Sequence, residues 1–316
     1  MKMDALNRRI RFAPPQPIGK TIELEETDYL VFQAIDRHGP LPAPILFEYV
    51  RHKHRSYGTF QRRLTKLYNG SKHVPSLLSR PPQQFAGYEA RYQPIFYDLL
   101  PAARTALGSR ATQFSPPRTD AFLHRAMTAC VAASIEIASR QVGIRYIPKE
   151  EVLAHAKCPD ATRFASNPLA IPVNVSGIKA ITPDDVFGFQ YPNGKYRFFA
   201  LEIDRKTESI ERSNPGQNTF GNKVRGYFDI LDRKVFGAHF GLPNLTVLTV
   251  TTNDKHAFNI AAFIALQSEP RLARKFLLKV EKHFAANWRV PRKPLAHLLG
   301  EPWINAGDGT ILISEP

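Results

Sequence analysis

The chain has 316 residues, of which 43% are apolar, and its formal net charge is +15. A chain of this length most often folds as two domains, and this apolar content is enough for ordinary cores. No run of about 18 apolar residues occurs, so the sequence predicts no membrane span. The N-terminal residues lack the apolar segment of a secretory signal, and we expect a cytoplasmic protein.

Positive charge is concentrated in the N-terminal third of the chain. Residues 1–118 contain 18 Lys and Arg against 9 Asp and Glu, and residues 49–88 contain eight Lys or Arg and no acid. Such a field attracts a polyanion, and nucleic acid is the usual one. The two cysteines, Cys130 and Cys158, lack metal-ligand spacing. We therefore expect double-stranded DNA as the partner, and no membrane.

The N-terminal part contains a basic arm at 1–24 and a domain at 25–110. Ser56 can cap a helix, and Asn69-Gly70 can end it. Periodicity predicts three short helices, two strands and a closing helix. These elements are placed at 27–38, 43–50, 56–69, 76–80, 91–97 and 99–107. The order is typical of a winged helix-turn-helix with a wing loop at 81–90, so we expect its third helix to enter the DNA major groove.

Polar and basic side chains surround the apolar face of the third predicted helix. Arg and Gln can read base edges, and Lys neutralises phosphate. The candidate DNA-binding residues are Arg51, Lys53, Arg55, Thr59, Arg62, Arg63, Lys66, Lys72 and Arg80. Two alternatives stay open: a merely solvated basic face, and a winged helix that binds protein.

A proline-marked stretch at 109–118 predicts a linker at 111–118, followed by a second domain at 119–316. Its predicted elements comprise a long helix, a first strand, a central hairpin, a further helix, an apolar parallel strand and two last helices. They are placed at 120–141, 143–147, 186–201, 223–231, 245–252, 256–267 and 271–288. Residues 207–220 are polar and loop-like, and the tail 291–316 is assigned to packing.

The central hairpin carries a group of acids. Two apolar runs flank Asn193-Gly194, a strong turn signal. An antiparallel pair places the start of one strand beside the end of the next, so Asp184 should lie near Glu202 and Asp204. Carboxylates gathered in this way repel one another unless a cation lies between them, and hard oxygen ligands suit Mg²⁺ or Mn²⁺. A hairpin with acids at its ends is also common as surface decoration.

The residues Pro183-Asp184 and Glu202-Ile203-Asp204-Arg205-Lys206 resemble the motif of the PD-(D/E)XK nucleases. The longer string around FFALEIDRKTE is similar to the replication-relaxation family of plasmid and mobile-element proteins. The resemblance implies an α/β (α+β) chain, with an N-terminal winged helix-turn-helix followed by a PD-(D/E)XK nuclease-like α/β domain with a mixed sheet.

The resemblance also implies roles for single residues. Asp184, Glu202 and Asp204 would bind Mg²⁺ or Mn²⁺. Lys206, in a literal D-x-K reading, or Lys223, on the helix after the hairpin, would stabilise developing negative charge. Glu136 matches a helical acid that touches the metal, or else pairs with Arg140. The Lys position after Glu202 is occupied by Asp204, which is a departure from the family pattern.

The resulting hypothesis is a DNA-binding protein with a Mg²⁺-dependent endonuclease domain that nicks or cleaves DNA in plasmid or mobile-element replication or transfer. Other mobile-element proteins and a second copy of the chain are further candidate partners. The alternative is a non-catalytic replication initiator or transcriptional regulator that keeps a degenerate nuclease fold.

Overall fold

The computed structural model describes residues 14–19, 21–54, 56–85, 93–108, 122–205 and 220–316. The chain forms two compact units. The first comprises Met1–Ile137 and Arg289–Leu295, and the second comprises Ala138–Trp288 and Ala296–Pro316. The two units thus divide inside helix α5 (Phe122–Gln141), whereas the predicted linker at 111–118 lies outside the described residues. None of the described helices is long and apolar enough to cross a membrane.

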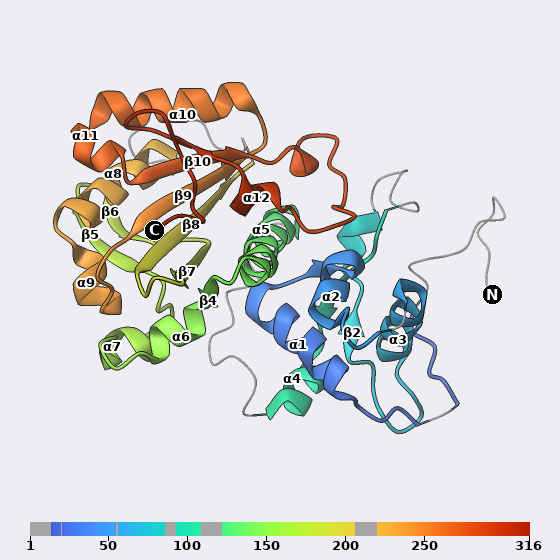
Figure 1. Cartoon of the computed structure of the whole chain (residues 1–316). Helices are drawn as coiled ribbons and strands as arrows, with labels where there is room; N and C mark the ends of the chain where they lie inside the picture. Colours follow the sequence, from blue (N-terminus) through green and yellow to red (C-terminus); the bar gives the residue numbers. More distant parts are fainter. Residues whose placement is uncertain (1–13, 20, 55, 86–92, 109–121, 206–219) are drawn as a thin grey trace. The chain divides into compact units, whose positions relative to one another are not determined.

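The first unit consists of helices and a three-stranded sheet (Figure 1). Besides α5, its elements are α1 (Glu26–His38), β1 (Leu41–Pro42), α2 (Ala43–Val50), α3 (Tyr57–Asn69), β2 (Leu78–Ser79), a 3₁₀ turn (Pro82–Phe85), β3 (Phe96–Leu99) and α4 (Pro101–Leu107). The three predicted helices, the strand pair and the closing helix are confirmed, although β2 and β3 are shorter than predicted. The strand β1 was not predicted.

The ends of α3 follow from its sequence. The Ser56 side chain accepts a hydrogen bond from the Thr59 amide, which caps the first turn. Gly70 ends the helix at φ +68°, and a Cβ at this position would meet the backbone of Ser76 at 2.7 Å. The described part of the arm pairs with this end, because the Ile18 amide donates to the Gly70 carbonyl over 3.0 Å.

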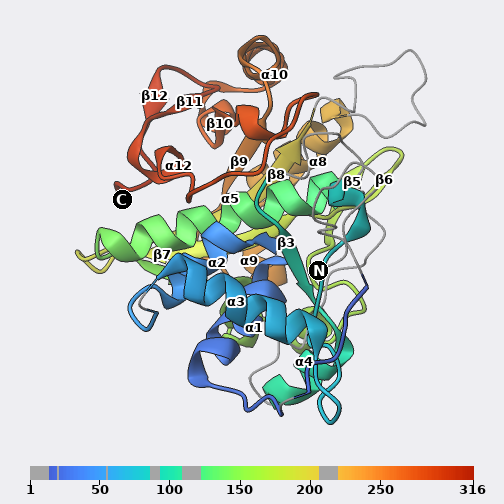
Figure 2. The same ribbon diagram turned by 90° about the vertical axis from the view of Figure 1, so that its right-hand side faces the viewer.

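The sheet of the first unit has the order β1-β3-β2 and is antiparallel throughout. Leu41 faces Tyr97, and Leu78 faces Leu99. Helices α1, α2 and α3 pack on one another, and α1 packs on β3 (Figure 2). Each helix buries an apolar stripe, so the amphipathic spacing seen in the sequence becomes a shared core.

The second unit is built on a seven-stranded mixed sheet of order β12-β11-β10-β9-β8-β7-β4. The strands of this sheet are β4 (Arg145–Ile147), β7 (Asp185–Gln190), β8 (Tyr196–Asp204), β9 (Thr246–Thr251), β10 (Phe276–Val280), β11 (Trp303–Asn305) and β12 (Thr310–Ile311). A separate hairpin is formed by β5 (Ile171–Val175) and β6 (Ile178–Ile181). The helices of the second unit are α6 (Lys149–Ala154), α7 (Asp160–Arg163), α8 (Phe220–Asp232), α9 (Val235–Phe240), α10 (Asp254–Gln267), α11 (Pro270–Ala273) and α12 (His297–Gly300), with a 3₁₀ turn at Lys282–Phe284. The chain is therefore of mixed α/β class.

The hairpin β7-β8 lies within this sheet and is confirmed. Gly194 takes φ +79° in its turn, as the Asn-Gly signal requires. Strand β8 pairs antiparallel with β7 and parallel with β9. Phe187 and Phe199 face each other with ring centroids 5.2 Å apart, and this aromatic core fixes the register.

Helices flank the strands. Helix α10 lies along β9 and β10, whereas α8 packs on the separate hairpin β5-β6 (Figure 1). A Cβ built at Gly226 of α8 would collide with the Ile181 side chain, so the helix backbone lies directly on β6.

One predicted element is wrong. The sequence predicts a helix over 271–288, but the α-helix there is confined to Pro270–Ala273, Phe276–Val280 forms β10, and Lys282–Phe284 forms a 3₁₀ turn. The physical reason is tertiary, because β10 pairs parallel with β9 and buries Phe276, Leu277 and Leu278. Short apolar runs cannot be assigned to helix or strand by periodicity alone. The loop-like stretch 207–220 lies outside the described residues except for Phe220, which begins α8.

Candidate functional site

The hairpin brings Asp184 beside Glu202. Asp185 faces Leu201 in the ladder, so Asp184 is the next position along, opposite Glu202. The Asp184 amide donates to the Leu201 carbonyl over 2.9 Å, and the Ile203 amide donates to Asp184 Oδ2 over 2.7 Å. One hydrogen bond thus fixes the Asp184 backbone before β7, and the other binds its carboxylate.

Asp185 has a different environment from its neighbour. Its carboxylate is buried, and Lys149 Nζ donates to Oδ1 over 3.1 Å. The Lys149 side chain is itself only 6% exposed. Asp185 thus forms a buried ion pair with α6, while Asp184 is the acid that lies next to Glu202.

Helix α8 directs two side chains at Glu202. The carboxylate is 1% exposed. Lys223 Nζ donates to Oε2 over 3.0 Å, and the Tyr227 hydroxyl donates to Oε1 over 2.6 Å. Lys223 and Tyr227 are four residues apart, so they lie on the same helix face. One carboxylate is therefore held from one helix by a cation and a hydroxyl.

The surroundings of Glu202 change its proton affinity. Burial raises the pKa of Glu202 to about 7, the Lys223 ammonium opposes this rise, and the neighbouring Asp184 charge adds to it. Burial, and then the Glu202 charge, raise the pKa of Tyr227 well above its usual value. Tyr227 consequently remains a hydrogen-bond donor at neutral pH, where Glu202 can gain or release a proton.

Asp204 ends β8 and binds a residue that the sequence analysis missed. His256 Nε2 lies 2.6 Å from Asp204 Oδ2, and both side chains are buried. The Asn253 side chain accepts from the His256 amide and caps α10, which places His256 in the first turn. The polar start of this helix directly follows the apolar run of β9, whose end lies beside the end of the parallel strand β8. A His in the first turn of the helix after β9 was the sequence signal that could have predicted this contact with Asp204.

Glu136 belongs to the first unit and has three partners there. Its carboxylate accepts from Arg37 Nη1 over 2.5 Å and from the Tyr49 hydroxyl over 2.9 Å, and His38 Nε2 lies 2.6 Å from Oε2. These contacts join α5 to α1 and α2. They are contacts that a buried structural carboxylate makes, and the role of Glu136 as a metal-touching acid or as a partner of Arg140 stays a prediction.

The three predicted metal ligands have unequal environments. Asp184 and Glu202 are neighbours, whereas Asp204 is bound to His256. Within the described ranges, no group of three or more His, Cys, Asp or Glu side chains is arranged to hold a metal ion. Lys223, which was predicted to stabilise charge at the site, contacts Glu202, and Lys206 lies outside the described residues.

Three of the predicted DNA-binding arginines contact acidic or aromatic side chains of the protein. Arg51 Nε donates to Glu48 Oε2 over 2.7 Å. Arg63 Nε donates to Asp28 Oδ1 over 2.9 Å, which ties α3 to α1. The Arg80 guanidinium lies 4.1 Å from the centroid of the Tyr68 ring. Arg63 and Arg80 thus contribute to the packing of the first unit.

The other described candidates on and around α3 are exposed. Arg62 also donates to the Thr59 hydroxyl over 3.2 Å. Arg55 lies outside the described residues. The exposed members of the predicted set are Arg51, Lys53, Thr59, Arg62, Lys66 and Lys72, of which Arg51 is paired with Glu48. They leave a positive surface along α3 that a polyanion can reach.

Comparisons with protein-family models, with curated proteins and with solved structures find no match to this chain.

Proposed function

We propose that the protein binds duplex DNA through α3 and cleaves or nicks a DNA strand at the carboxylates of its second unit. The observation that carries the proposal is the grouping of Asp184, Glu202 and Lys223. A buried carboxylate beside a second acid, with an ammonium on the same carboxylate, is the kind of perturbed group found at active sites.

The order of elements supports both halves of the proposal. In the first unit, α1-β1-α2-α3-β2-β3 with the sheet order β1-β3-β2 corresponds to a winged helix-turn-helix. In the second, the antiparallel hairpin β7-β8 carries the acids, and β8 continues through α8 and α9 to the parallel strand β9, an order compatible with the PD-(D/E)XK resemblance. Asp184 and Glu202 are, on this proposal, the two acids of the PD-(D/E)XK pattern.

Asp184 and Glu202 fit a divalent cation with hard ligands. The Asp184 charge raises the pKa of Glu202, and a cation between the two acids would remove this repulsion. Mg²⁺ is usually held by only one or two carboxylates together with water and substrate phosphates. These two residues would therefore hold it, and the bound ion would polarise the scissile phosphate and activate a water.

The remaining side chains position charge. Tyr227 fixes the orientation of Glu202 by its hydrogen bond to Oε1. Lys223 is 30% exposed at its side chain, so its ammonium can face a phosphate while it stays beside Glu202. A cation so placed stabilises the negative charge that develops as the phosphodiester is attacked.

A supercoiled-plasmid nicking assay with Mg²⁺ or Mn²⁺ tests the proposal. Wild type should nick the plasmid, and both Asp184→Asn and Glu202→Gln should abolish nicking while leaving DNA binding unchanged. Lys223→Met should slow it by about a hundredfold. Glu151→Gln, which removes an acid of α6 that pairs with Arg145, is the matched control and should nick as wild type does.

The non-catalytic alternative also has an observation in its favour. Both oxygens of Glu202 already accept hydrogen bonds, and Asp204 is bound to His256. In a nuclease-like domain without activity, the same contacts would serve only to give the buried acids their hydrogen-bond partners. Absence of nicking by wild type with every divalent ion, together with no metal-dependent rise in melting temperature, would favour a DNA-binding initiator or regulator.

A further inference from the structure

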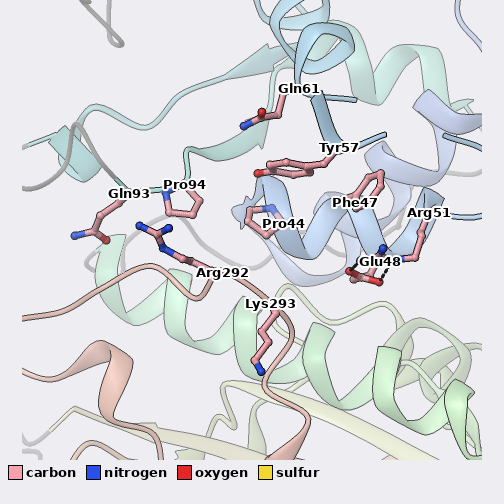
Figure 3. A pocket seen from close by; sticks show the side chains of 10 residues that line it. All are labelled: Pro44, Phe47, Glu48, Arg51, Tyr57, Gln61, Gln93, Pro94, Arg292 and Lys293. Carbon is pink, nitrogen blue, oxygen red and sulfur yellow. Dashed lines mark hydrogen bonds and ion pairs between the residues drawn. The ribbon is translucent and has the colours of Figure 1, made fainter. Parts of the chain in front are cut away.

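A hollow of about 500 Å³ lies in the first unit beside the N-terminal half of α3 (Figure 3). Its walls come from α2, from α3, from the residues before β3 and from the segment Arg289–Leu295, all of which belong to this unit. Pockets that bind small ligands have volumes of about 300–1,000 Å³, so this hollow is large enough for a nucleotide.

The segment Arg289–Leu295 is anchored at its base and charged at its tip. The Val290 amide donates to Gln93 Oε1 over 2.6 Å, and Val290 and Leu295 are buried. Arg292 and Lys293 between them are exposed, and neither has an ion pair or hydrogen bond with the described part of the chain. A fixed backbone thus presents two available cations.

The charge of the hollow is positive. Glu48 is its acid, and both carboxylate oxygens of Glu48 accept from Arg51. Arg292 and Lys293 are consequently not neutralised by Glu48. A ligand that fills the hollow gains by carrying negative charge.

The opposite wall carries an aromatic ring and an amide. Tyr57 and Gln61 are four residues apart on α3, and Gln61 is exposed. Figure 3 shows the Gln61 amide above the Tyr57 ring, and the Arg292 guanidinium next to Pro94. Lys293 extends away from this aromatic wall. A ring, an amide and a guanidinium are the groups that bind a base, its polar edge and its phosphate.

We propose that this hollow binds one unpaired nucleotide of a DNA strand, with the base on Tyr57, its edge at the Gln61 amide and the phosphate at Arg292. The inference rests on the proposed function, because Gln61 adjoins Arg62 on the helix proposed to bind DNA. Paired bases are stacked within the duplex and cannot enter a hollow of this kind, so the occupant is a nucleotide outside the paired region.

A nucleoside phosphate could come from a strand or from the free nucleotide pool. The exposed cations Arg62 and Lys66 continue the positive surface along α3. A free nucleotide would leave these cations unused, whereas a strand contacts them as well. We therefore assign the site to an unpaired nucleotide attached to duplex DNA.

The test compares a plain duplex with the same duplex carrying a short single-stranded tail, in EDTA so that no cleavage occurs. A fluorescent adenine analogue at the first unpaired position reports stacking. Wild type should bind the tailed probe at least about fivefold more tightly than the plain duplex, since stacking of one base on an aromatic side chain is worth about 1–3 kcal/mol. Its fluorescence should fall on binding.

Variants separate the parts of the pocket. Arg292→Ala, Gln61→Ala and Tyr57→Leu should each reduce the preference for the tailed probe, and Tyr57→Phe should retain it. Lys293→Ala removes the same charge as Arg292→Ala but should affect both probes alike. If Arg292→Ala, like Lys293→Ala, weakens binding of the tailed probe and of the plain duplex by the same factor, Arg292 is only a general phosphate contact. That result would overturn the proposal.

Two further outcomes have distinct meanings. If a free mononucleotide displaces the tailed probe from wild type at a concentration similar to that of the probe, the ligand is the free nucleotide, and the strand assignment is wrong. If Arg62→Ala with Lys66→Ala abolishes binding of both probes while Arg292→Ala changes neither, the proposed function stands and this inference fails. If wild type binds neither probe, the proposed function fails with it.

Discussion

Lys223 Nζ lies 3.0 Å from Glu202 Oε2, and the two residues come from successive elements, β8 and α8. The proposed PD-(D/E)XK resemblance would place a Lys two residues after Glu202, on the strand itself. In this chain Asp204 stands at that strand position and binds His256. The ammonium therefore reaches the carboxylate from the helix, and Glu202 remains a buried acid with a cation beside it.

The first prediction concerns pH. The pKa of Glu202 is raised from 4.5 to about 7, so the folded protein binds this proton more tightly than the unfolded chain does. Its contribution to stability is fully present below pH 4.5 and is lost as the pH rises through about 7. The loss is on the order of 3 kcal/mol, because one pKa unit is worth about 1.4 kcal/mol.

Glu202→Gln removes the titration and keeps the shape. We expect the free energy of unfolding of metal-free Glu202→Gln to change less over this pH window than that of wild type, as measured by urea denaturation in EDTA. Glu151→Gln should retain the wild-type dependence. A Glu202→Gln protein with an unchanged pH slope would contradict the assignment of the raised pKa.

The second prediction separates DNA contacts from packing on α3. Arg62→Ala with Lys66→Ala should weaken duplex binding and reduce the slope of log affinity against log salt by about 1.8, at about 0.9 per lost phosphate contact. Arg63→Ala should instead lower the free energy of unfolding by about 1–3 kcal/mol, because it leaves the buried Asp28 carboxylate without its guanidinium. Filter binding at several salt concentrations and thermal denaturation measure the two effects. Equal salt slopes for the double variant and wild type would exclude α3 as the phosphate contact.

The third prediction concerns Asp204. Millimolar Mg²⁺ or Mn²⁺ should raise the melting temperature of wild type, since an ion that binds only the folded state stabilises it. Asp184→Asn and Glu202→Gln should abolish this rise. Asp204→Asn should lower the free energy of unfolding by about 1–3 kcal/mol through its lost His256 contact, and keep the rise. Complete loss of the rise in Asp204→Asn would instead place Asp204 among the cation ligands.

The fourth prediction concerns the packing of α8 against β6. Gly226→Ala introduces a Cβ that collides with Ile181, and overpacking of this kind costs about 1–3 kcal/mol. The gain in helix propensity is at most about 1 kcal/mol, so we expect net destabilisation in chemical denaturation. Ile181→Ala combined with Gly226→Ala should show favourable coupling in a double-mutant cycle. Gly58→Ala, which meets nothing within 4 Å, is the control and should be neutral or stabilising. Additive effects of the two substitutions would contradict the contact.

Local signals predicted much of the fold. Asn193-Gly194 predicted the hairpin, and Ser56 and Gly70 predicted the ends of α3, because turns and caps depend on neighbouring residues. The strand β10 was missed because its identity depends on β9, which is distant in the sequence. Local patterns cannot supply such partners.

The contacts of the candidate site likewise fall into those that local sequence predicts and those that depend on distant elements. The register of one hairpin was enough to bring Asp184 beside Glu202. The partners of Asp204, Arg63 and Glu136 come from other elements, so their contacts with His256, Asp28 and Arg37 could not be read from spacing. A basic residue on a helix looks the same in a sequence whether it faces solvent or holds a buried acid.

The return of Arg289–Leu295 to the first unit has a consequence for biosynthesis. The ribosome makes the chain from its N-terminus, so α3 emerges early, while Arg292 and Lys293 emerge only after the whole of Ala138–Trp288. The first unit therefore cannot be finished before the second unit has largely been made, because its last wall follows Ala138–Trp288 in the chain. A chain terminated before Arg292 would carry α3 without this guanidinium, and under the proposal above it would lose the preference for an unpaired nucleotide.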